Sequence, residues 1–117
     1  MTAKTALPIT PQAMRALTAQ VLDEDAELPT AEVLDDLTLL YRGHLMLLIP
    51  KVEKAAGGRP ESDVAKTGAL AGVREARTRL NLVPDRPLPR QVAHAQRLAR
   101  SVDCLLDHLV NLSGERP

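Results

Sequence analysis

The stretch 92-VAHAQRLARSVDCLLDHLVNL-112 carries the most regular hydrophobic pattern in the chain. Its apolar residues recur three and four positions apart: Val92, Ala95, Ala99, Val102, Leu106 and Leu109, with Leu98, Leu105 and Leu112 widening the stripe. This spacing places side chains on one face of an α-helix. A face this broad is expected of a helix that packs against two neighbours. We therefore predict a long helix over about residues 88–112 within a helical bundle.

Two further helices are predicted upstream from their start and stop signals. The pair Thr10–Pro11 has the form of an N-cap followed by proline at the first helical position, which predicts a helix over residues 11–24. Thr30 is expected to cap a second, more apolar helix over 30–49. Pro50 should kink or stop this helix near its end, because proline lacks the backbone N–H of a helix interior.

A remaining helix, predicted over residues 62–82, carries a stripe of small side chains. The stripe residues are spaced four, three and four apart: Ala65, Ala69, Gly72 and Ala76. Gly68 and Gly72 also form a GxxxG pair. Small side chains let the backbone of a neighbouring helix come close. We therefore expect another helix of the same chain to pack tightly against this stripe.

The four patterns predict an all-α fold, a mostly antiparallel four-helix bundle. No segment has the alternating pattern of a strand, so amphipathic helices can bury their apolar faces only against each other. The chain of 117 residues has room for one such domain, spanning 1–117. Residues 1–10 precede the first helix and are expected to be flexible.

The composition limits the partners that the protein can bind. The chain has no Phe and no Trp, and its one Tyr is Tyr41, so it lacks the rings on which single-stranded nucleic acids stack. Its formal net charge is zero, and this gives no general attraction to nucleic acid or to an anionic membrane. The apolar run of the 30–49 helix is too short to span a bilayer and contains Arg42 and His44. We expect no membrane partner and no nucleic-acid partner.

Charges are nevertheless unevenly distributed along the chain. Residues 23–36 are rich in acidic side chains and contain no basic ones, whereas residues 74–100 are rich in arginine. These segments form either solvated faces that partly neutralise each other or, in the arginine-rich segment, a strip that binds anions. The single Cys104 cannot form an internal disulfide, and no apolar run of signal-peptide type begins the chain. We expect a cytoplasmic protein.

The sequence lacks the common signatures of catalysis and cofactor binding. It contains no glycine-rich phosphate loop, no HExxH, no paired cysteines and no GxSxG. We therefore expect no cofactor and no metal site. Cys104 is expected to project away from the apolar stripe of its helix as an exposed thiol, with no histidine at a fixed spacing to activate it.

Histidines supply the remaining candidates for chemistry. His44 lies in the middle of the apolar face of the 30–49 helix, where it is either a hydrogen-bonded core residue or a ligand or general base. His94 and His108 lie fourteen residues apart on one helix, too far apart for the two to bind one metal ion by themselves. The alternative is a small cofactor-free enzyme or small-molecule-binding protein with a pocket between helices, in which Tyr41, Arg42 and one of these histidines join His44.

The outer face of the 30–49 helix is a candidate interface. If its core is centred on Leu37, His44 and Leu48, helical geometry places Leu39 and Met46 almost opposite. Ile49 is expected to flank this pair, with Arg42 between them. Aligned exposed apolar residues usually mark an interface. We therefore predict a homodimer through an antiparallel contact of this helix, or a different protein partner at the same face.

Three segments carry a resemblance to a known group of proteins: 41-YRGHLMLLIPKVE-53, 73-VREARTRL-80 and the quoted 92–112 stretch. They resemble an uncharacterised family of short actinomycete proteins that are labelled as natural-product-biosynthesis proteins without an assigned activity. The resemblance implies an accessory role near specialised metabolism and transfers no catalytic residue. The expected function is thus a non-catalytic helical interaction protein.

Overall fold

The computed structural model describes residues 10–83 and 87–113, which form four helices. These are α1 (Pro11–Leu22), α2 (Ala31–Gly57), α3 (Val64–Leu80) and α4 (Leu88–Leu112). No strand is present in these two ranges. The prediction of an all-α bundle is confirmed. Of residues 1–10, for which flexibility was predicted, 1–9 lie outside the described ranges, and Thr10 is the N-cap of α1.

Side-chain caps begin three of the four helices. The Thr10 hydroxyl accepts a hydrogen bond from the Ala13 N–H at 3.1 Å, and Thr30 accepts one from Val33 at 3.3 Å. Both threonines were predicted as caps, because a hydroxyl at this position satisfies one of the free N–H groups of the first turn. In α3 the cap is Asp63, whose carboxylate accepts from the Ala65 N–H at 3.1 Å.

Two predicted boundaries were too wide. The first helix ends at Leu22 instead of residue 24, because Asp23 adopts an extended conformation as its C-cap. The third helix is Val64–Leu80 rather than 62–82, because Asp63 caps it and Asn81 forms its C-cap. The fourth agrees with its predicted range.

The predicted end of α2 near Ile49 was wrong. The helix continues through Pro50 to Gly57, seven residues beyond the proline. Proline at position 50 removes the helical hydrogen bond to the carbonyl of Met46. Both residues lie on the exposed side of α2, where water can hydrate this carbonyl. The proline is therefore tolerated on the outer side of the helix.

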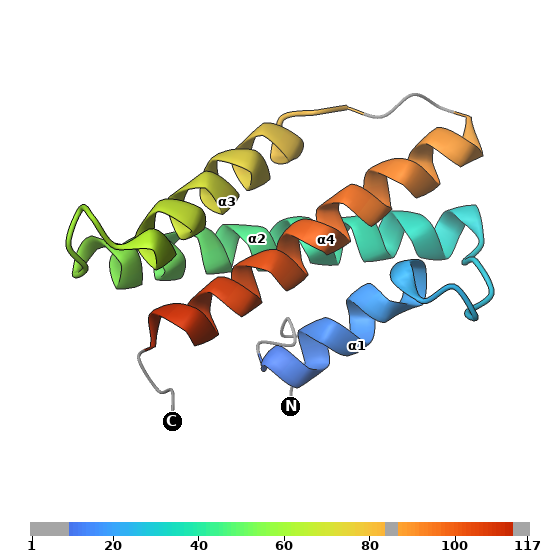
Figure 1. The fold of residues 1–117 in the computed structure, drawn as a ribbon. Helices are drawn as coiled ribbons and strands as arrows, with labels where there is room; N and C mark the ends of the chain where they lie inside the picture. Colours follow the sequence, from blue (N-terminus) through green and yellow to red (C-terminus); the bar gives the residue numbers. More distant parts are fainter. Residues whose placement is uncertain (1–9, 84–86, 114–117) are drawn as a thin grey trace, which may run out of the picture.

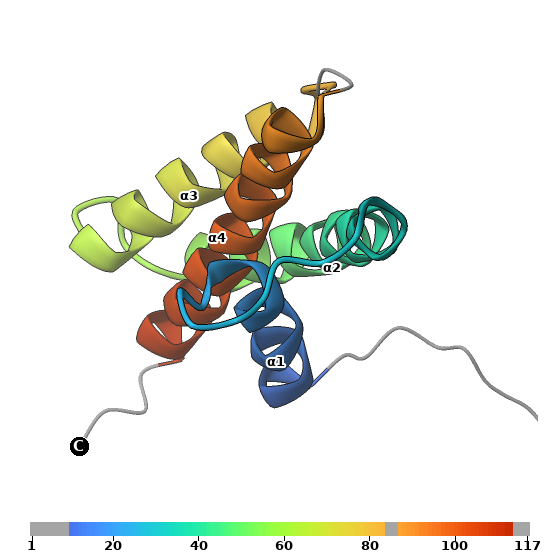
Figure 2. The same ribbon diagram turned by 90° about the vertical axis from the view of Figure 1, so that its right-hand side faces the viewer.

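The helices are arranged around a central pair formed by α2 and α4. These two make the most extensive contact and cross each other at an incline, whereas α1 and α3 flank the pair (Figures 1 and 2). Within the described residues α1 and α3 do not contact each other. Consecutive helices alternate in direction, so most contacts are antiparallel, while α2 and α4 run in the same general direction (Figure 1).

One continuous apolar core fills the space between the four helices. It is built almost entirely from aliphatic side chains and Tyr41, as the composition requires. The largest completely buried side chains are Tyr41, Leu34, Leu45, Leu98, Leu105, His44, Val52, Val102 and Thr18. Each such side chain contributes about 1.5–3 kcal/mol when it is aliphatic and fully removed from water.

Polar side chains attach the short helix α1 to α4. The Thr18 hydroxyl donates to a carboxylate oxygen of Asp103 at 2.8 Å. Arg15 donates to the carboxylate of Asp107 at 2.7 Å, one turn further along α4. Among the described residues α1 does not contact α3 and makes only a small contact with α2, so its position depends mainly on α4.

Candidate functional site

Two of the predicted polar candidates, Tyr41 and His44, belong to the core. Both side chains are completely buried on α2. The Tyr41 hydroxyl donates to the backbone carbonyl of Leu17 on α1 at 2.7 Å. Burial, and secondarily the charge of Asp103, raises the pKa of the Tyr41 hydroxyl well above its usual range. A neutral, buried phenol of this kind positions α1 and is a poor proton donor for chemistry.

Arg42 and His94 lie close enough to interact electrostatically. The Arg42 guanidinium donates to the carbonyl of Leu80 at 2.9 Å, so its cation lies at the C-terminal end of α3, where helix carbonyls favour positive charge. His94 is buried on α4. Burial lowers the pKa of the His94 imidazole, and the cations of Arg42 and Arg97 lower it further. The arrangement favours a neutral His94.

The other end of α4 brings Cys104 and His108 against the small-residue stripe of α3. A Cβ atom placed on Gly72 would lie 3.1 Å from the ring atoms Cδ2 and Nε2 of His108 and 3.6 Å from the Sγ of Cys104. At Gly68 the nearest atom would be Cε1 of His108, at 3.5 Å. The expected close approach of a neighbouring helix to this stripe is confirmed, and the helix is α4.

This contact corrects the expectation for Cys104. The thiol is half-buried against α3 rather than exposed, and His108 lies four residues along on the same side of α4. Burial raises the pKa of the thiol, and the carboxylates of Asp107 and Glu75 raise it further, although Arg79 opposes them. Because the thiolate is the nucleophile, a raised pKa lowers the reactivity of Cys104 at neutral pH.

The structure does not bring the polar candidates together into one site. Tyr41 bonds to α1, Arg42 and His94 lie near the end of α3, and His108 packs on the α3 glycines. His94 and His108 are separated along α4 by about 21 Å, at 1.5 Å per residue. Among the described residues no group of three or more His, Cys, Asp or Glu side chains could hold a metal ion.

Two arginines of the 74–100 segment are held by internal partners. Arg79 donates to Glu75 at 2.9 Å and to the Ser101 hydroxyl at 2.9 Å, which ties α3 to α4. Arg77 pairs with Glu53 of α2 at 2.8 Å. For Arg77 and Arg79, internal pairing favours the interpretation as a partly neutralised surface over that of an anion-binding strip.

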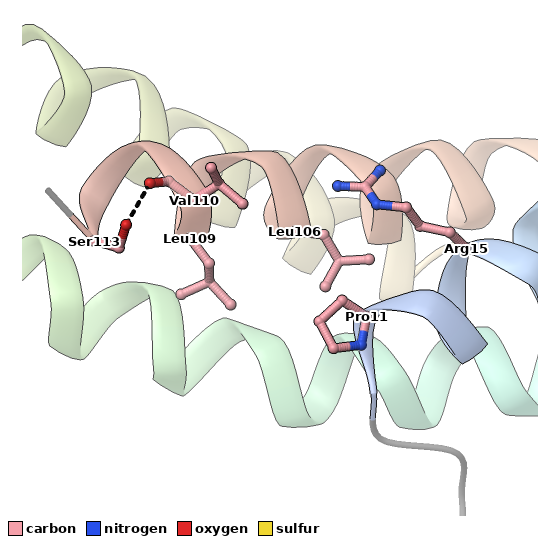
Figure 3. Close-up of a pocket in the computed structure, with 6 residues that line it drawn as sticks. All are labelled: Pro11, Arg15, Leu106, Leu109, Val110 and Ser113. Carbon is pink, nitrogen blue, oxygen red and sulfur yellow. Dashed lines mark hydrogen bonds between the residues drawn. The ribbon is translucent and has the colours of Figure 1, made fainter. Parts of the chain in front are cut away.

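An apolar groove lies between α1, the second half of α2 and the last turns of α4. Two adjoining depressions of about 390 and 360 Å³ share Pro11, Leu106 and Leu109. In Figure 3 the two leucines project from α4 toward the space between α4 and α2, near the start of α1. Lys51 lies in the wall of one depression and Arg15 in that of the other. Among the described residues that line it, the groove is mostly apolar and contains no His, Cys, Asp or Glu side chain.

The outer face of α2 is the second apolar surface. Leu39 and Met46 are 67% and 66% exposed, so neither α1 nor the segment after residue 50 covers them among the described residues. Every exposed α2 residue between Asp36 and Lys51 is apolar: Leu39, Met46, Leu47 and Pro50. On α4, by contrast, every exposed residue from 90 to 107 is charged: Arg90, Arg97, Arg100 and Asp107. This stretch of α2 therefore differs from the charged outer side of α4.

Two residues predicted for this face lie elsewhere. Ile49 is only 5% exposed and belongs to the core. Arg42 is half-buried and directed to the end of α3 by its bond to Leu80. The buried side of α2 is wider than predicted, because this helix packs against both α3 and α4, and the wider sector includes Ile49.

The structure also adds residues that sequence reasoning missed. Leu47 and Pro50 extend the exposed apolar face, and the signal for them was the absence of charge at outward positions between Asp36 and Lys51. The groove has no such signal, because its residues come from three helices. Within residues 10–83 and 87–113, no helix is both long and apolar enough to cross a lipid bilayer.

Comparison with known proteins identifies a family but no activity. No curated protein and no solved structure matches this chain. Residues 12–114 match the family described as "Family of unknown function (DUF6415)". The match covers all four helices, from the first turn of α1 to the end of α4. The chain therefore belongs to the DUF6415 family of unknown function.

Proposed function

We propose that this protein is a non-catalytic helical interaction protein that self-associates through the outer face of α2. The observation that supports the proposal is the exposed, uncharged surface around Leu39 and Met46. An exposed contiguous apolar surface on a folded domain usually marks a binding site for another protein. Symmetric dimers are the most frequent assemblies of this kind, so a second copy of the chain is the first choice of partner.

The distribution of polar side chains supports a non-catalytic role. The candidates Tyr41, Arg42, His94 and His108 have structural contacts in three different places, with Arg42 and His94 near each other, and His44 has no exposed surface. The alternative hypothesis needs a solvent-reachable pocket around His44. The proposal requires no cofactor, and it places the protein in the cytoplasm as an accessory factor. The resemblance of residues 41–53, 73–80 and 92–112 to proteins labelled for natural-product biosynthesis supports that setting.

Light scattering of the wild-type protein and of the variant Leu39→Glu/Met46→Glu tests this proposal. We expect the wild type to have the mass of two chains and the variant to have the mass of one, because the variant would bury four carboxylates in the dimer contact. The circular dichroism of the variant should remain helical, since both side chains are exposed in the single chain.

A matched control replaces two exposed apolar residues elsewhere. Val64→Glu/Val110→Glu changes α3 and α4 at positions that are 84% and 60% exposed. This control should remain dimeric. A wild type that is monomeric at high micromolar concentration would refute self-association, and unfolding of the α2 variant would show that Leu39 and Met46 stabilise the single chain instead.

A further inference from the structure

The outer face of α2 has opposite charges at its two ends. Its N-terminal end carries the exposed acids Glu32, Asp35 and Asp36. Its C-terminal end carries the exposed Lys51 and Lys54. Only apolar residues are exposed between these two ends. The face is therefore acidic at one end, apolar in the middle and basic at the other.

Glu53, the acid nearest the basic end of the face, does not neutralise the charge of the lysines there. Glu53 is only partly exposed, and its carboxylate pairs at 2.8 Å with Arg77 of the neighbouring helix α3. The ion pair lowers the pKa of Glu53, with the hydrogen bond from Arg77 as the largest cause. The basic character of this end thus comes from Lys51 and Lys54.

Helical geometry places these groups symmetrically about Gly43. At 100° per residue, Gly43 lies near the middle of the outer face, opposite the buried Tyr41 and Leu48. Leu39 precedes Gly43 by four residues and Met46 follows it by three. On the two sides, Asp36 lies seven residues before and Lys51 eight after, and Glu32 and Lys54 each lie eleven away. At 100° per residue, all of these residues lie within about 80° of Gly43, on the outer half of the helix.

We propose that α2 pairs with α2 of a second copy in antiparallel orientation, with the two Gly43 residues meeting at the twofold axis. This inference rests on the proposed self-association and specifies its geometry. In this register Leu39 of one copy lies against Met46 of the other. Glycine at the crossing point lets the two helix backbones approach closely.

The same register also pairs the charged ends. Asp36 faces Lys51 of the second copy, and Glu32 faces Lys54. Each pair occurs twice because the contact is symmetric. A parallel pairing would instead place acids against acids and lysines against lysines, which is destabilising. Charge complementarity therefore selects the antiparallel orientation.

Charge reversal tests the register. The acid variant Glu32→Lys/Asp36→Lys and the lysine variant Lys51→Glu/Lys54→Glu each place like charges at both ends of an antiparallel dimer. We expect each to dimerise about tenfold more weakly than wild type, or worse, in sedimentation equilibrium. The variant with all four substitutions restores opposite charges and should dimerise like wild type. An equimolar mixture of the acid and lysine variants should form a heterodimer for the same reason.

The controls separate electrostatics from folding. Glu24→Lys/Glu27→Lys makes the same change of net charge at exposed positions before α2 and should leave the dimer intact. The fourfold variant contains the same Glu32→Lys change in the first turn of α2, so its recovery would exclude helix damage as the cause of weakening. Raising the salt concentration should reduce the difference between the variants and wild type, because salt screens exposed charges.

Each outcome decides between the two proposals. If the acid and lysine variants dimerise like wild type, or if the fourfold variant does not recover, the antiparallel register is overturned while self-association through α2 stands. If the wild type is monomeric at high micromolar concentration, the proposed self-association itself is overturned. Weakening in both variants with recovery in the fourfold variant and in the mixture supports the register.

Discussion

At the scale of single residues, the polar side chains that look most like chemistry in the sequence serve as connections between helices. Tyr41 joins α2 to α1 through its bond to Leu17, and Arg42 joins α2 to the end of α3 through its bond to Leu80. A buried donor must find an acceptor, and in a small bundle the nearest acceptor is often the backbone of the next helix. These residues therefore specify how the helices are placed.

His94 gives this domain a predicted sensitivity to acid. Its pKa is lowered in the folded protein by burial and by the cations of Arg42 and Arg97, whereas the unfolded value is about 6.5. A group with a lowered folded pKa binds protons more readily in the unfolded chain. Its contribution to stability is therefore complete above about pH 6.5 and is lost as the pH falls through the lower folded pKa.

The replacement His94→Gln should make the free energy of unfolding depend less steeply on pH in this range. Urea unfolding at a series of pH values between about 7 and 5 measures the free energy of unfolding across the relevant range. We expect the wild-type value to fall with pH more steeply than that of the variant. Equal slopes in the two proteins would show that His94 does not contribute to acid sensitivity.

At the scale of helices, α3 and α4 pack closely because α3 presents glycines where α4 presents larger side chains. Gly72 faces both His108 and Cys104, whereas Gly68 faces only the edge of the His108 ring. Glycine in a helix is destabilising by about 0.5–1 kcal/mol relative to alanine, so each glycine has an energetic cost. Space for the imidazole explains the glycine at position 72 but not the one at 68.

The pair of variants Gly68→Ala and Gly72→Ala should separate these two cases. At Gly68 the new methyl group would sit 3.5 Å from His108, an ordinary contact, and we expect a gain in stability of about 0.5–1 kcal/mol. At Gly72 the new methyl group would sit 3.1 Å from the ring, so His108 must shift and the gain should be smaller or absent. Denaturant midpoints compare the two directly, and an equal gain would contradict tight packing at Gly72.

At the scale of the whole molecule, local patterns predicted the helices well and tertiary relations poorly. The α4 stripe and the caps Thr10 and Thr30 depend on spacing along one segment, so the sequence was sufficient for them. The predicted helix end at Pro50 was wrong because the free-energy cost of a proline inside a helix depends on whether the freed carbonyl, here that of Met46, faces water. Ile49 was misplaced because the width of a buried sector depends on how many helices pack against it.

The same contrast between local patterns and tertiary relations applies to the candidate surfaces. The exposure of Leu39 and Met46 followed from helical geometry, because these residues lie opposite a strongly apolar face. The half-buried state of Cys104 did not follow, since it depends on the approach of the α3 glycines to this side of α4. The groove at Pro11, Leu106 and Leu109 required the relative heights of three helices, which no local pattern contains.

The helix α1 is the part of this bundle that we expect to open first. It buries only Met14, Thr18 and Val21 completely, and it touches no part of α3 among the described residues. Regions with few buried contacts open without unfolding the rest of a domain. The amides of α1 should therefore exchange with deuterium faster than the core amides of α2 and α4.

Removing the hydrogen bonds that attach α1 should speed up the exchange of the α1 amides more than that of the core amides of α2 and α4. Thr18→Val deletes the donor to Asp103, and Tyr41→Phe deletes the donor to the Leu17 carbonyl. Each loss should lower the free energy that holds α1 in its docked position by about 1 kcal/mol. The hydrogen-exchange protection of the α1 amides should then fall about fivefold. Hydrogen exchange read by mass spectrometry should show faster exchange in residues 11–22 of both variants, with the central amides of α2 and α4 much less affected. An equal loss of protection in all four helices would mean that α1 unfolds only together with the whole bundle, because its contacts with α4 then belong to the same cooperative unit.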